Sequence, residues 1–161
     1  MNLKDIKIFS EKNPGRIFFN YNLKKSNWFN IGGEAKIFFR PENLNELINF
    51  LKLYNKRSKI FVLGAGSNIL FADGIFDGVV IKLGKNFSNL SILNKEIIIA
   101  GSIISDKKLS DFAYENNLSG FEFLSCIPGT VGGGIRMNSG CFGKEFKDII
   151  LSVQALDMYG K

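Results

Sequence analysis

The sequence has no histidine and only two cysteines, Cys126 and Cys141. The absence of histidine removes the most common general base and the Ser-His and Cys-His nucleophile pairs. A structural zinc site needs about four thiolate or imidazole ligands, so zinc is excluded as well. Any catalysis must therefore use a group other than histidine, and we expect no metal site.

The sequence also lacks a long hydrophobic run. Its longest apolar stretch, residues 97–104 (IIIAGSII), is interrupted by glycine and serine and is far shorter than the roughly 20 residues of a membrane-spanning helix. Residues 1–16 alternate charged and apolar side chains, without the apolar block or cleavage site of a secretory signal. We therefore expect a cytoplasmic protein with no membrane partner, whose cysteines are reduced thiols.

Lysine and arginine outnumber aspartate and glutamate, 21 to 15, which gives a net charge of +6. The basic residues come singly or in pairs, as at residues 24–25, 56–57 and 107–108, and never as a run. A nucleic-acid interface normally gathers them in one patch. We interpret these lysines as solvated surface residues and predict no nucleic-acid partner, while an anionic small ligand remains compatible with the charge.

Hydrophobic residues make up 45% of the 161 residues and charged residues 22%, which is typical of a globular protein. Asn43 followed by Glu46 forms an N-cap pattern, and an apolar helical face follows it. Ser105 caps a second helix that ends at the Asn116-Asn117 pair. The pattern thus predicts helices over 43–55 and 105–116, and strands over 35–40, 59–63, 78–83, 96–100 and 151–157.

A polar, irregular stretch at residues 87–94 predicts a seam in the chain. We place a boundary near residue 85, with one subdomain over residues 1–85 and a second over residues 86–161. The last expected strand runs into a turn and stops without a partner strand, and complete domains usually cover such an edge. From this we expect a truncated or divided protein, completed by a missing C-terminal segment or a second chain.

Residues 61–70 read FVLGAGSNIL, an apolar run that opens into a glycine loop. Gly64 and Gly66 fit the start of a dinucleotide fingerprint, but Ile69 stands where its third glycine belongs and turn residues follow instead of a helix. No Gly-Lys-Ser/Thr of a Walker motif occurs either. The loop is compatible with an anion nest, to which Ser67 and Asn68 add donors, and equally with a tight turn between buried strands.

A second glycine-rich stretch, residues 125–143 (SCIPGTVGGGIRMNSGCFG), favours the ligand interpretation. Each glycine is costly to order, by up to about 1 kcal/mol relative to alanine in regular structure. A fold tolerates this density where the backbone must approach something closely. Two such loops indicate one elongated ligand between two subdomains.

The segments 26–51, 61–81 and 100–148, with VQALDMYGK at the end, resemble in order and spacing the flavin domain of the UDP-N-acetylenolpyruvoylglucosamine reductase (MurB) family of peptidoglycan synthesis. The resemblance covers about residues 20–161. It implies an α+β, two-subdomain FAD-binding fold of the vanillyl-alcohol oxidase type, with FAD stretched between the subdomains and the substrate domain missing.

The resemblance also implies which residues bind FAD. It assigns the LGAGSN loop to the pyrophosphate, and the IPGTVGG stretch and the segment around Asn138 to the flavin and ribityl portions, with the NIGG stretch close by. The cofactor-binding residues it implies are Ile31, Gly32, Gly64, Gly66, Ser67, Asn68, Ile69, Ile127, Pro128, Gly129, Gly132, Gly133, Asn138 and Gly140.

The reaction that the resemblance implies is reduction of UDP-N-acetylglucosamine-enolpyruvate to UDP-N-acetylmuramate, with NADPH as electron donor and FAD as hydride carrier. Through cell-wall biogenesis it serves cell shape and cell division. The family's catalytic residues lie beyond residue 161, so we name none here and expect the fragment alone to be inactive. A non-catalytic nucleotide-binding or regulatory module and a basic nucleic-acid-binding protein are the alternatives.

The sequence departs from the family at a few positions. Ser139 and Cys141 stand where alanines are usual, Ser102 replaces another small residue, and Arg136 replaces an apolar or aromatic one. The small substitutions should leave FAD binding intact. We expect Arg136 to lie on the surface and Cys141 to be an inert buried thiol.

Overall fold

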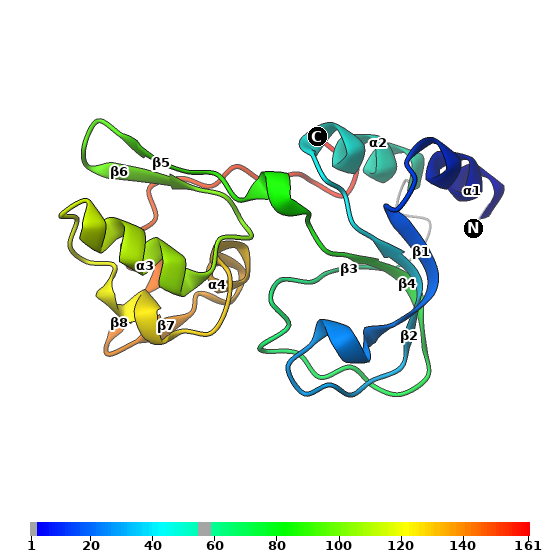
Figure 1. Ribbon diagram of the computed structural model, residues 1–161, viewed down its shortest axis with the longest axis horizontal. Coiled ribbons are helices and arrows are strands. Elements are labelled where there is room, and N and C mark those ends of the chain that lie inside the picture. The colour runs from blue at the N-terminus through cyan, green and yellow to red at the C-terminus, as the bar shows by residue number, and fades with distance from the viewer. Residues whose placement is uncertain (1–2, 55–58) are drawn as a thin grey trace. The chain divides into compact units, whose positions relative to one another are not determined.

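The computed structural model describes residues 3–54 and 59–161 (Figure 1). The basic pair at 56–57 and the last residue of the expected helix 43–55 lie outside the described residues. The helices are α1 (Leu3–Lys12), α2 (Leu44–Tyr54), α3 (Asp106–Glu115) and α4 (Val131–Met137). The strands are β1 (Ile17–Asn22), β2 (Glu34–Phe39), β3 (Lys59–Val62), β4 (Ile75–Ile81), β5 (Leu90–Leu93), β6 (Ile97–Ala100), β7 (Gly140–Cys141) and β8 (Lys144–Glu145), and the 3-10 turns are η1 (Leu23–Ser26), η2 (Lys85–Phe87), η3 (Glu122–Cys126) and η4 (Phe146–Asp148).

The chain divides into two compact units. Unit 1 holds the described residues up to Leu63, residues 69–84 and residues 154–161, and unit 2 holds Gly64–Asn68 and Lys85–Val153. The chain thus passes from unit 1 to unit 2 next to the expected boundary near residue 85. Two segments differ from the expected subdomains: the glycine loop at 64–68 belongs to unit 2, and residues 154–161 belong to unit 1. The assignment of residues 1–85 and 86–161 as FAD-binding subdomains stays a prediction.

Unit 1 is built on a mixed sheet in the order β1-β2-β4-β3. The central strand β2 pairs antiparallel with β1 and parallel with β4, and β3 is parallel to β4. Alternate residues of β2 enter different cores, because successive side chains of a strand point to opposite faces. Ile37 and Phe39 join the core that includes α1 and α2, whereas Phe38 joins a second one. Ala35 also joins the second core, because the register of β2 on β4 shifts between Ala35 and Ile37.

Helix α2 covers one face of this sheet through Phe50, whose ring stacks on Phe39 at 4.1 Å. The expected N-cap is confirmed: Asn43 Oδ1 accepts a hydrogen bond from the Glu46 amide at 2.9 Å, and Glu46 Oε2 accepts one from the Glu42 amide at 2.8 Å. Such a reciprocal cap stabilises the first turn by satisfying amides that have no partner within the helix. The helix signal in the sequence was therefore local and strong.

Unit 2 combines the antiparallel pair β5–β6, helices α3 and α4, and the short pair β7–β8. Its core gathers Ile104, Leu109, Phe123, Leu124, Val131 and Phe146. The Ser105 hydroxyl accepts a hydrogen bond from the Lys108 amide at 3.2 Å and so caps α3 as expected, and the helix ends before Asn117, which has φ +58°.

Several expectations for the secondary structure were incomplete. Strand β4 begins at Ile75, earlier than expected, because it pairs with β2 from Glu34 onward. The expected irregular seam at 87–94 contains β5, and the glycine-rich stretch contains α4. The N-terminal helix α1 and strand β1 were not predicted, although α1 buries Ile6 in the first core of unit 1.

The strand expected over residues 151–157 was wrong. This segment pairs with no other strand among the described residues, and it ends in a turn in which Asp157 Oδ1 accepts hydrogen bonds from the amides of Tyr159 and Lys161 at 2.8 and 2.9 Å. Alternating apolar residues suggested a strand, but Leu156 instead packs against the core around Phe50 as an irregular segment.

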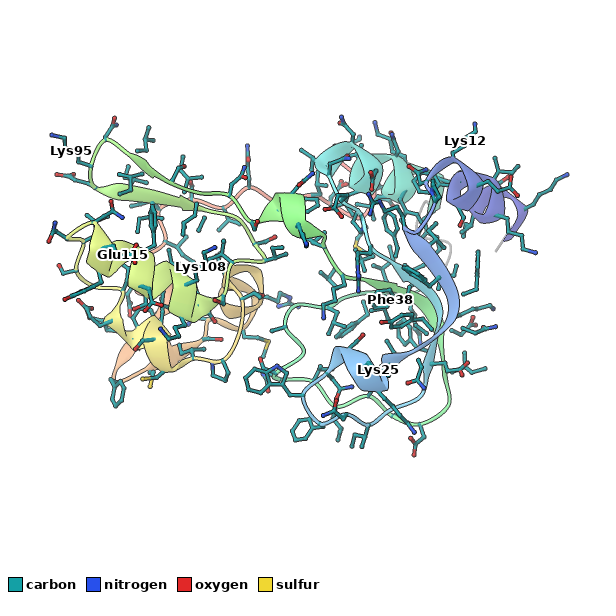
Figure 2. The ribbon with its side chains drawn as sticks, in the orientation of Figure 1. Lys12, Lys25, Phe38, Lys95, Lys108 and Glu115 are labelled. Atoms are coloured by element: carbon teal, nitrogen blue, oxygen red, sulfur yellow. The ribbon has the colours of Figure 1, made fainter. Side chains whose placement is uncertain are left out.

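The basic residues are spread over many elements. The lysines labelled in Figure 2 come from α1 (Lys12), η1 (Lys25), the turn between β5 and β6 (Lys95) and α3 (Lys108), and all four are exposed. The prediction that no nucleic acid is bound stays a prediction. Within the described part of the chain, no helix combines the length and apolar character needed to cross a membrane.

Candidate functional site

The first glycine loop, Gly64–Asn68, follows β3 directly. The Leu63 amide donates a hydrogen bond to the Ile81 carbonyl at 2.8 Å, and the Leu63 side chain is buried, so the loop leaves the sheet from a fixed point. Gly66 has φ +77°, a left-handed conformation that glycine adopts without strain. The backbone therefore requires glycine here whether or not a ligand is bound.

The second glycine loop, residues 127–133, is fastened to the segment between β6 and α3. Thr130 forms an antiparallel bridge with Ser105, the Val131 amide donates to the Ile104 carbonyl at 2.9 Å, and the Gly132 amide donates to the Ser102 carbonyl at 2.8 Å. These bonds satisfy amides at the start of α4 that lack partners within the helix. They explain how a Val-Gly-Gly-Gly sequence forms a helix.

The two glycine loops meet within unit 2. The Ser67 hydroxyl donates a hydrogen bond to the Pro128 carbonyl at 2.5 Å. A Cβ added to Gly64 would lie 3.0 Å from Thr130 Oγ1 and 4.0 Å from the Gly133 Cα. We call residues 64–68 and 127–133 the two-loop cradle. It brings together most of the residues predicted to bind the cofactor, although they are far apart in the sequence.

Packing within the protein accounts for some of the glycines of the cradle. A Cβ at Gly132 would lie 2.9 Å from Ser102 Cβ, and one at Gly129 would lie 2.7 Å from Asp106 Oδ2, so close packing within the protein requires glycine at both positions. At Gly133, by contrast, the nearest described atom outside its helix, Thr130 Oγ1, would be 3.5 Å from the Cβ, an ordinary contact. Protein packing leaves Gly133 unexplained, and this fits a backbone that a cofactor approaches closely.

Asp106, the first residue of α3, lies directly behind this cradle. Its side chain is fully buried, and neither carboxyl oxygen has a hydrogen-bond partner among residues 3–54 and 59–161. Burial raises the pKa of Asp106 to about 6, because a carboxylate loses its hydration there. Sequence reasoning missed this residue, since an acidic residue after a serine N-cap is an ordinary helix start.

Asn138 and Gly140, also predicted to contact the cofactor, lie at the far end of α4. Asn138 has φ +46° and ends the helix, its Nδ2 donates to Glu145 Oε2 at 2.9 Å, and its Oδ1 accepts from the Lys147 amide at 3.0 Å. A Cβ at Gly140 would lie 2.5 Å from the Lys144 carbonyl oxygen in the β7–β8 pair. Both residues have structural roles, and their contact with a cofactor stays a prediction.

The remaining predicted residues, Ile31, Gly32 and Ile69, belong to unit 1. Ile31 and Gly32 line a hollow of about 440 Å³ together with residues 70–73. The loop is held by Asn27, whose Nδ2 donates to the carbonyls of Leu23 and Ile31, both at 2.9 Å. Trp28 and Phe29, which come three and two residues before Ile31 in the sequence, are each 60% exposed. An apolar part of a ligand suits this surface, whereas Ile69 packs against the second core of the unit.

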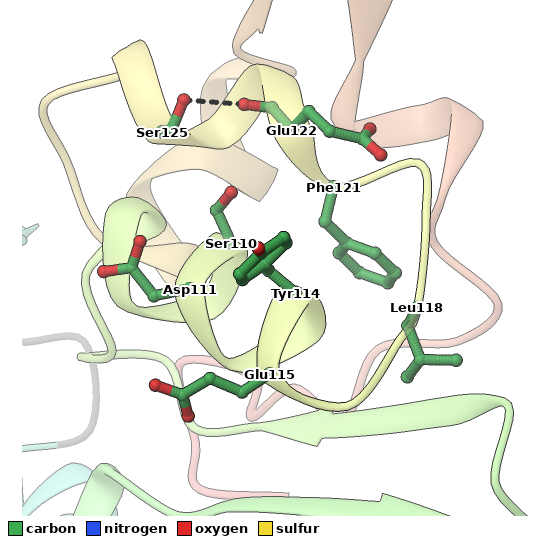
Figure 3. Close-up of a pocket in the computed structure, with 8 residues that line it drawn as sticks. All are labelled: Ser110, Asp111, Tyr114, Glu115, Leu118, Phe121, Glu122 and Ser125. Carbon is green, nitrogen blue, oxygen red and sulfur yellow. Dashed lines mark hydrogen bonds between the residues drawn. The ribbon is translucent and has the colours of Figure 1, made fainter.

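A second hollow, of about 420 Å³, lies on unit 2 between α3 and η3 (Figure 3). No residue predicted to bind the cofactor lines it in the described part of the chain. Two of its carboxylates already have partners: Asp111 forms an ion pair with Lys107 at 2.6 Å, and Glu122 accepts a hydrogen bond from the Gly120 amide at 2.9 Å. The hollow is therefore separate from the candidate site.

Of the departures from the family, only the surface position of Arg136 is confirmed, and the expectations of intact FAD binding and of an inert thiol at Cys141 stay predictions. Both cysteines are free: Cys126 is exposed, and Cys141 is half-buried against the core of unit 2. Arg136 is exposed on α4.

A family model described as "FAD binding domain" matches residues 35–161. The chain belongs to the FAD binding domain family. The predicted α+β FAD-binding fold is thereby confirmed, and FAD is the cofactor that the family's description names.

Two relatives that match this chain share one name. A protein of Pelagibacter ubique named UDP-N-acetylenolpyruvoylglucosamine reductase is 61% identical over 161 residues, which is 100% of this chain and 53% of the relative. A protein of the same name from Rickettsia akari is 48% identical over 88% of this chain and 48% of its own length. The crystal structure of the reductase MurB from Thermus caldophilus matches with a TM-score of 0.63 and 29% identity, covering 80% of this chain and 44% of that one.

The resemblance seen in the sequence is thus confirmed. The chain spans about half the length of the curated relatives it matches.

We expect the substitution Asp106→Asn to change stability in a pH-dependent way. The native pKa of about 6 lies above the ordinary value of 3.8, so the folded protein binds the proton more tightly than the unfolded chain does. Below about pH 4 the carboxyl is neutral in both the folded and the unfolded chain, and the folded protein is at its most stable with respect to this group. As the pH rises through 6, the unfolding free energy falls, because the carboxyl ionises more readily in the unfolded chain. Relative to wild type, the variant should therefore gain on the order of 2 kcal/mol in unfolding free energy between about pH 4 and pH 8.

Urea denaturation at both pH values measures this change. Asp111→Asn, an exposed aspartate on the same helix, is the matched control and should show no such gain. An equal effect of Asp106→Asn at both pH values would contradict the expectation.

Proposed function

We propose that this chain is the FAD-binding portion of an NADPH-dependent reductase that converts UDP-N-acetylglucosamine-enolpyruvate to UDP-N-acetylmuramate. The observation that carries the proposal is the meeting of two side-chain-poor loops in unit 2, joined by the hydrogen bond from Ser67 to Pro128. Membership of the FAD binding domain family and a relative of that name matching all 161 residues support it. The substrate's place in peptidoglycan synthesis makes the cytoplasm the proposed location.

In this proposal the two-loop cradle binds FAD where its loops meet: residues 64–68 hold the pyrophosphate, and residues 127–133 line the adjoining ribityl and flavin portions. Residues 64–68 and 127–133 carry no charged side chain, so backbone amides are the groups that would hold the phosphates. The Ser67 hydroxyl donates its hydrogen bond to the Pro128 carbonyl and would therefore act by fixing the distance between the loops. The exposed Asn68 would remain as a side-chain donor to the ligand. Gly133 allows the cofactor to approach α4 closely.

The bound flavin would supply the redox chemistry by accepting a hydride from NADPH and passing it to the enolpyruvyl group. The residues of this chain would bind and orient the flavin, with Ile31 and the hollow that it lines accommodating an apolar part. The UDP-sugar site and the catalytic groups are proposed to belong to the half of the relatives' length that this chain does not match. We expect these 161 residues to bind FAD without reducing substrate by themselves.

The purified protein should bind FAD and show the absorption spectrum of a bound flavin. Trp28 is the only tryptophan in the sequence and lies three residues from Ile31. If FAD contacts the loop as proposed, the emission of Trp28 should be quenched as FAD is added. A fluorescence titration measures both the affinity and the quenching. A colourless protein that leaves FAD free at every concentration would contradict the proposed function and support the alternative of a module without flavin.

Gly133→Ala and Gly132→Ala form a matched pair that separates ligand binding from packing. Gly133→Ala has room in the fold and removes a helix-interior glycine, so unfolding free energy should stay constant or rise by up to about 1 kcal/mol, while FAD affinity falls at least tenfold, or roughly 1.4 kcal/mol. Gly132→Ala should lose roughly 1 to 3 kcal/mol of stability, because its Cβ meets Ser102.

Thermal or urea unfolding and FAD titration on both variants measure the two effects. Unchanged FAD affinity in folded Gly133→Ala protein would remove Gly133 from the site.

Ser67→Ala tests the junction of the two loops. Without the hydroxyl, the Pro128 carbonyl loses a donor, and one hydrogen bond contributes about 1 kcal/mol net. We expect FAD affinity to fall about fivefold, because the loops are no longer held at one distance. Ser125→Ala, which removes a comparable hydrogen bond to Glu122 at 2.7 Å, is the control. Equal FAD dissociation constants for the two variants would contradict a role of Ser67 in the site.

A further inference from the structure

Asp106 is the buried ionisable group for which the proposed function gives no use. Its side chain has an exposed fraction of 0%, and both of its oxygens are without hydrogen-bond partners in the described ranges. Burying an unpaired carboxylate is costly, and buried charges are normally paired. A group in this situation responds strongly to any further charge placed near it.

Asp106 is tied to the cradle by three contacts. Its amide donates a hydrogen bond to the Gly129 carbonyl at 3.3 Å. Its Oδ2 lies 2.7 Å from the point where a Cβ of Gly129 would be, so the carboxyl faces the backbone of the loop directly. Its neighbour Ser105 pairs with Thr130, and Thr130 Oγ1 in turn lies beside Gly64. The backbone of Gly129 therefore lies between the Asp106 carboxyl and the place where the two loops meet.

The charged groups around Asp106 do not neutralise it. The segments 64–68, 97–105 and 127–135 contain no ionisable side chain. On α3, Lys107 is paired with Asp111 and both Lys107 and Lys108 are exposed. On η3, which packs against α3, Glu122 and Cys126 are exposed, and on α4 Arg136 is exposed in the last turn. Burial alone accounts for the raised pKa of Asp106, about 6.

We propose that Asp106 takes up a proton when FAD binds, so that its protonation state controls the affinity of the cradle for the cofactor. The inference rests on the proposed function. The pyrophosphate of FAD is anionic, and a like charge close to a carboxylate in a poorly hydrated site disfavours the ionised form. The bound state therefore holds the neutral acid to a higher pH than the free state does, and up to one proton enters from solvent with each FAD, depending on the pH.

The direction of the pH effect follows from linkage. Below the pKa of the free protein, about 6, Asp106 is neutral in both states and affinity is at its maximum. As the pH rises above that value, binding must first protonate the carboxylate, and affinity falls by up to about tenfold per pH unit. The fall ends at the pKa of the FAD-bound protein, above which Asp106 is ionised in both states.

The test is a titration of the purified protein with FAD between about pH 5.5 and pH 8.5, followed by flavin fluorescence. Wild type should bind FAD more weakly as the pH rises. Asp106→Asn should remove this dependence and bind FAD at the highest pH at least as tightly as wild type. The control Asp111→Asn should keep the wild-type dependence.

Calorimetry supplies a second measurement that needs no variant. The heat of FAD binding to wild type, compared between buffers of different ionisation enthalpy near pH 7, gives the protons taken up, and we expect a value between zero and one that is clearly positive. A pH-independent affinity of wild type with no proton uptake, or a dependence that persists in Asp106→Asn, overturns the inference and leaves the proposed function intact. Failure of wild type to bind FAD at any pH overturns the proposed function itself.

Discussion

The contact between residues 64–68 and residues 127–133 is the constraint on which the candidate site depends. Gly64–Asn68 packs with unit 2, although the strand before it and residues 69–84 after it belong to unit 1. The hydrogen bond from Ser67 to Pro128 is the described polar link across this junction. This bond adds a polar link to the packing of Gly64 against Thr130 and so helps to fix the separation of the two loops. The bond joins residues 61 apart in the sequence, and together with the approach of Gly64 to Thr130 it defines where the two loops meet.

The elements that the sequence predicts well are those whose signals are local. The caps at Asn43 and Ser105 lie within three residues of the amides they satisfy, so α2 and α3 could be placed from the sequence. Helix α4 could not, because Val131–Met137 has three glycines and its first amides are satisfied by Ile104 and Ser102, far away in the sequence. The mistaken strand at 151–157 has the opposite cause: its pattern suits a strand, but no strand pairs with it in the described structure.

The candidate site divides in the same way. Glycine density pointed to both loops, but a glycine required by packing and a glycine left open for a ligand look alike in a sequence. Gly132 and Gly133 are neighbours, and only the structure shows that the first meets Ser102 while the second has an ordinary contact with Thr130. Asp106 left no signal at all, since its burial depends on Gly129, which lies beyond the end of α3 and η3 in the chain. Tertiary packing therefore decides what each residue can do.

The charge distribution gives the cradle an unusual character for an anion site. The net charge of +6 comes from side chains outside it, because neither loop contains a lysine or an arginine. The proposed affinity for a pyrophosphate therefore rests on oriented backbone dipoles, which do not titrate, rather than on cationic side chains of the two loops. Asp106 is buried directly behind one of these loops, and its charge is of the sign that opposes the ligand. Since backbone dipoles do not change with pH, the pH response proposed for the cradle rests on this carboxyl.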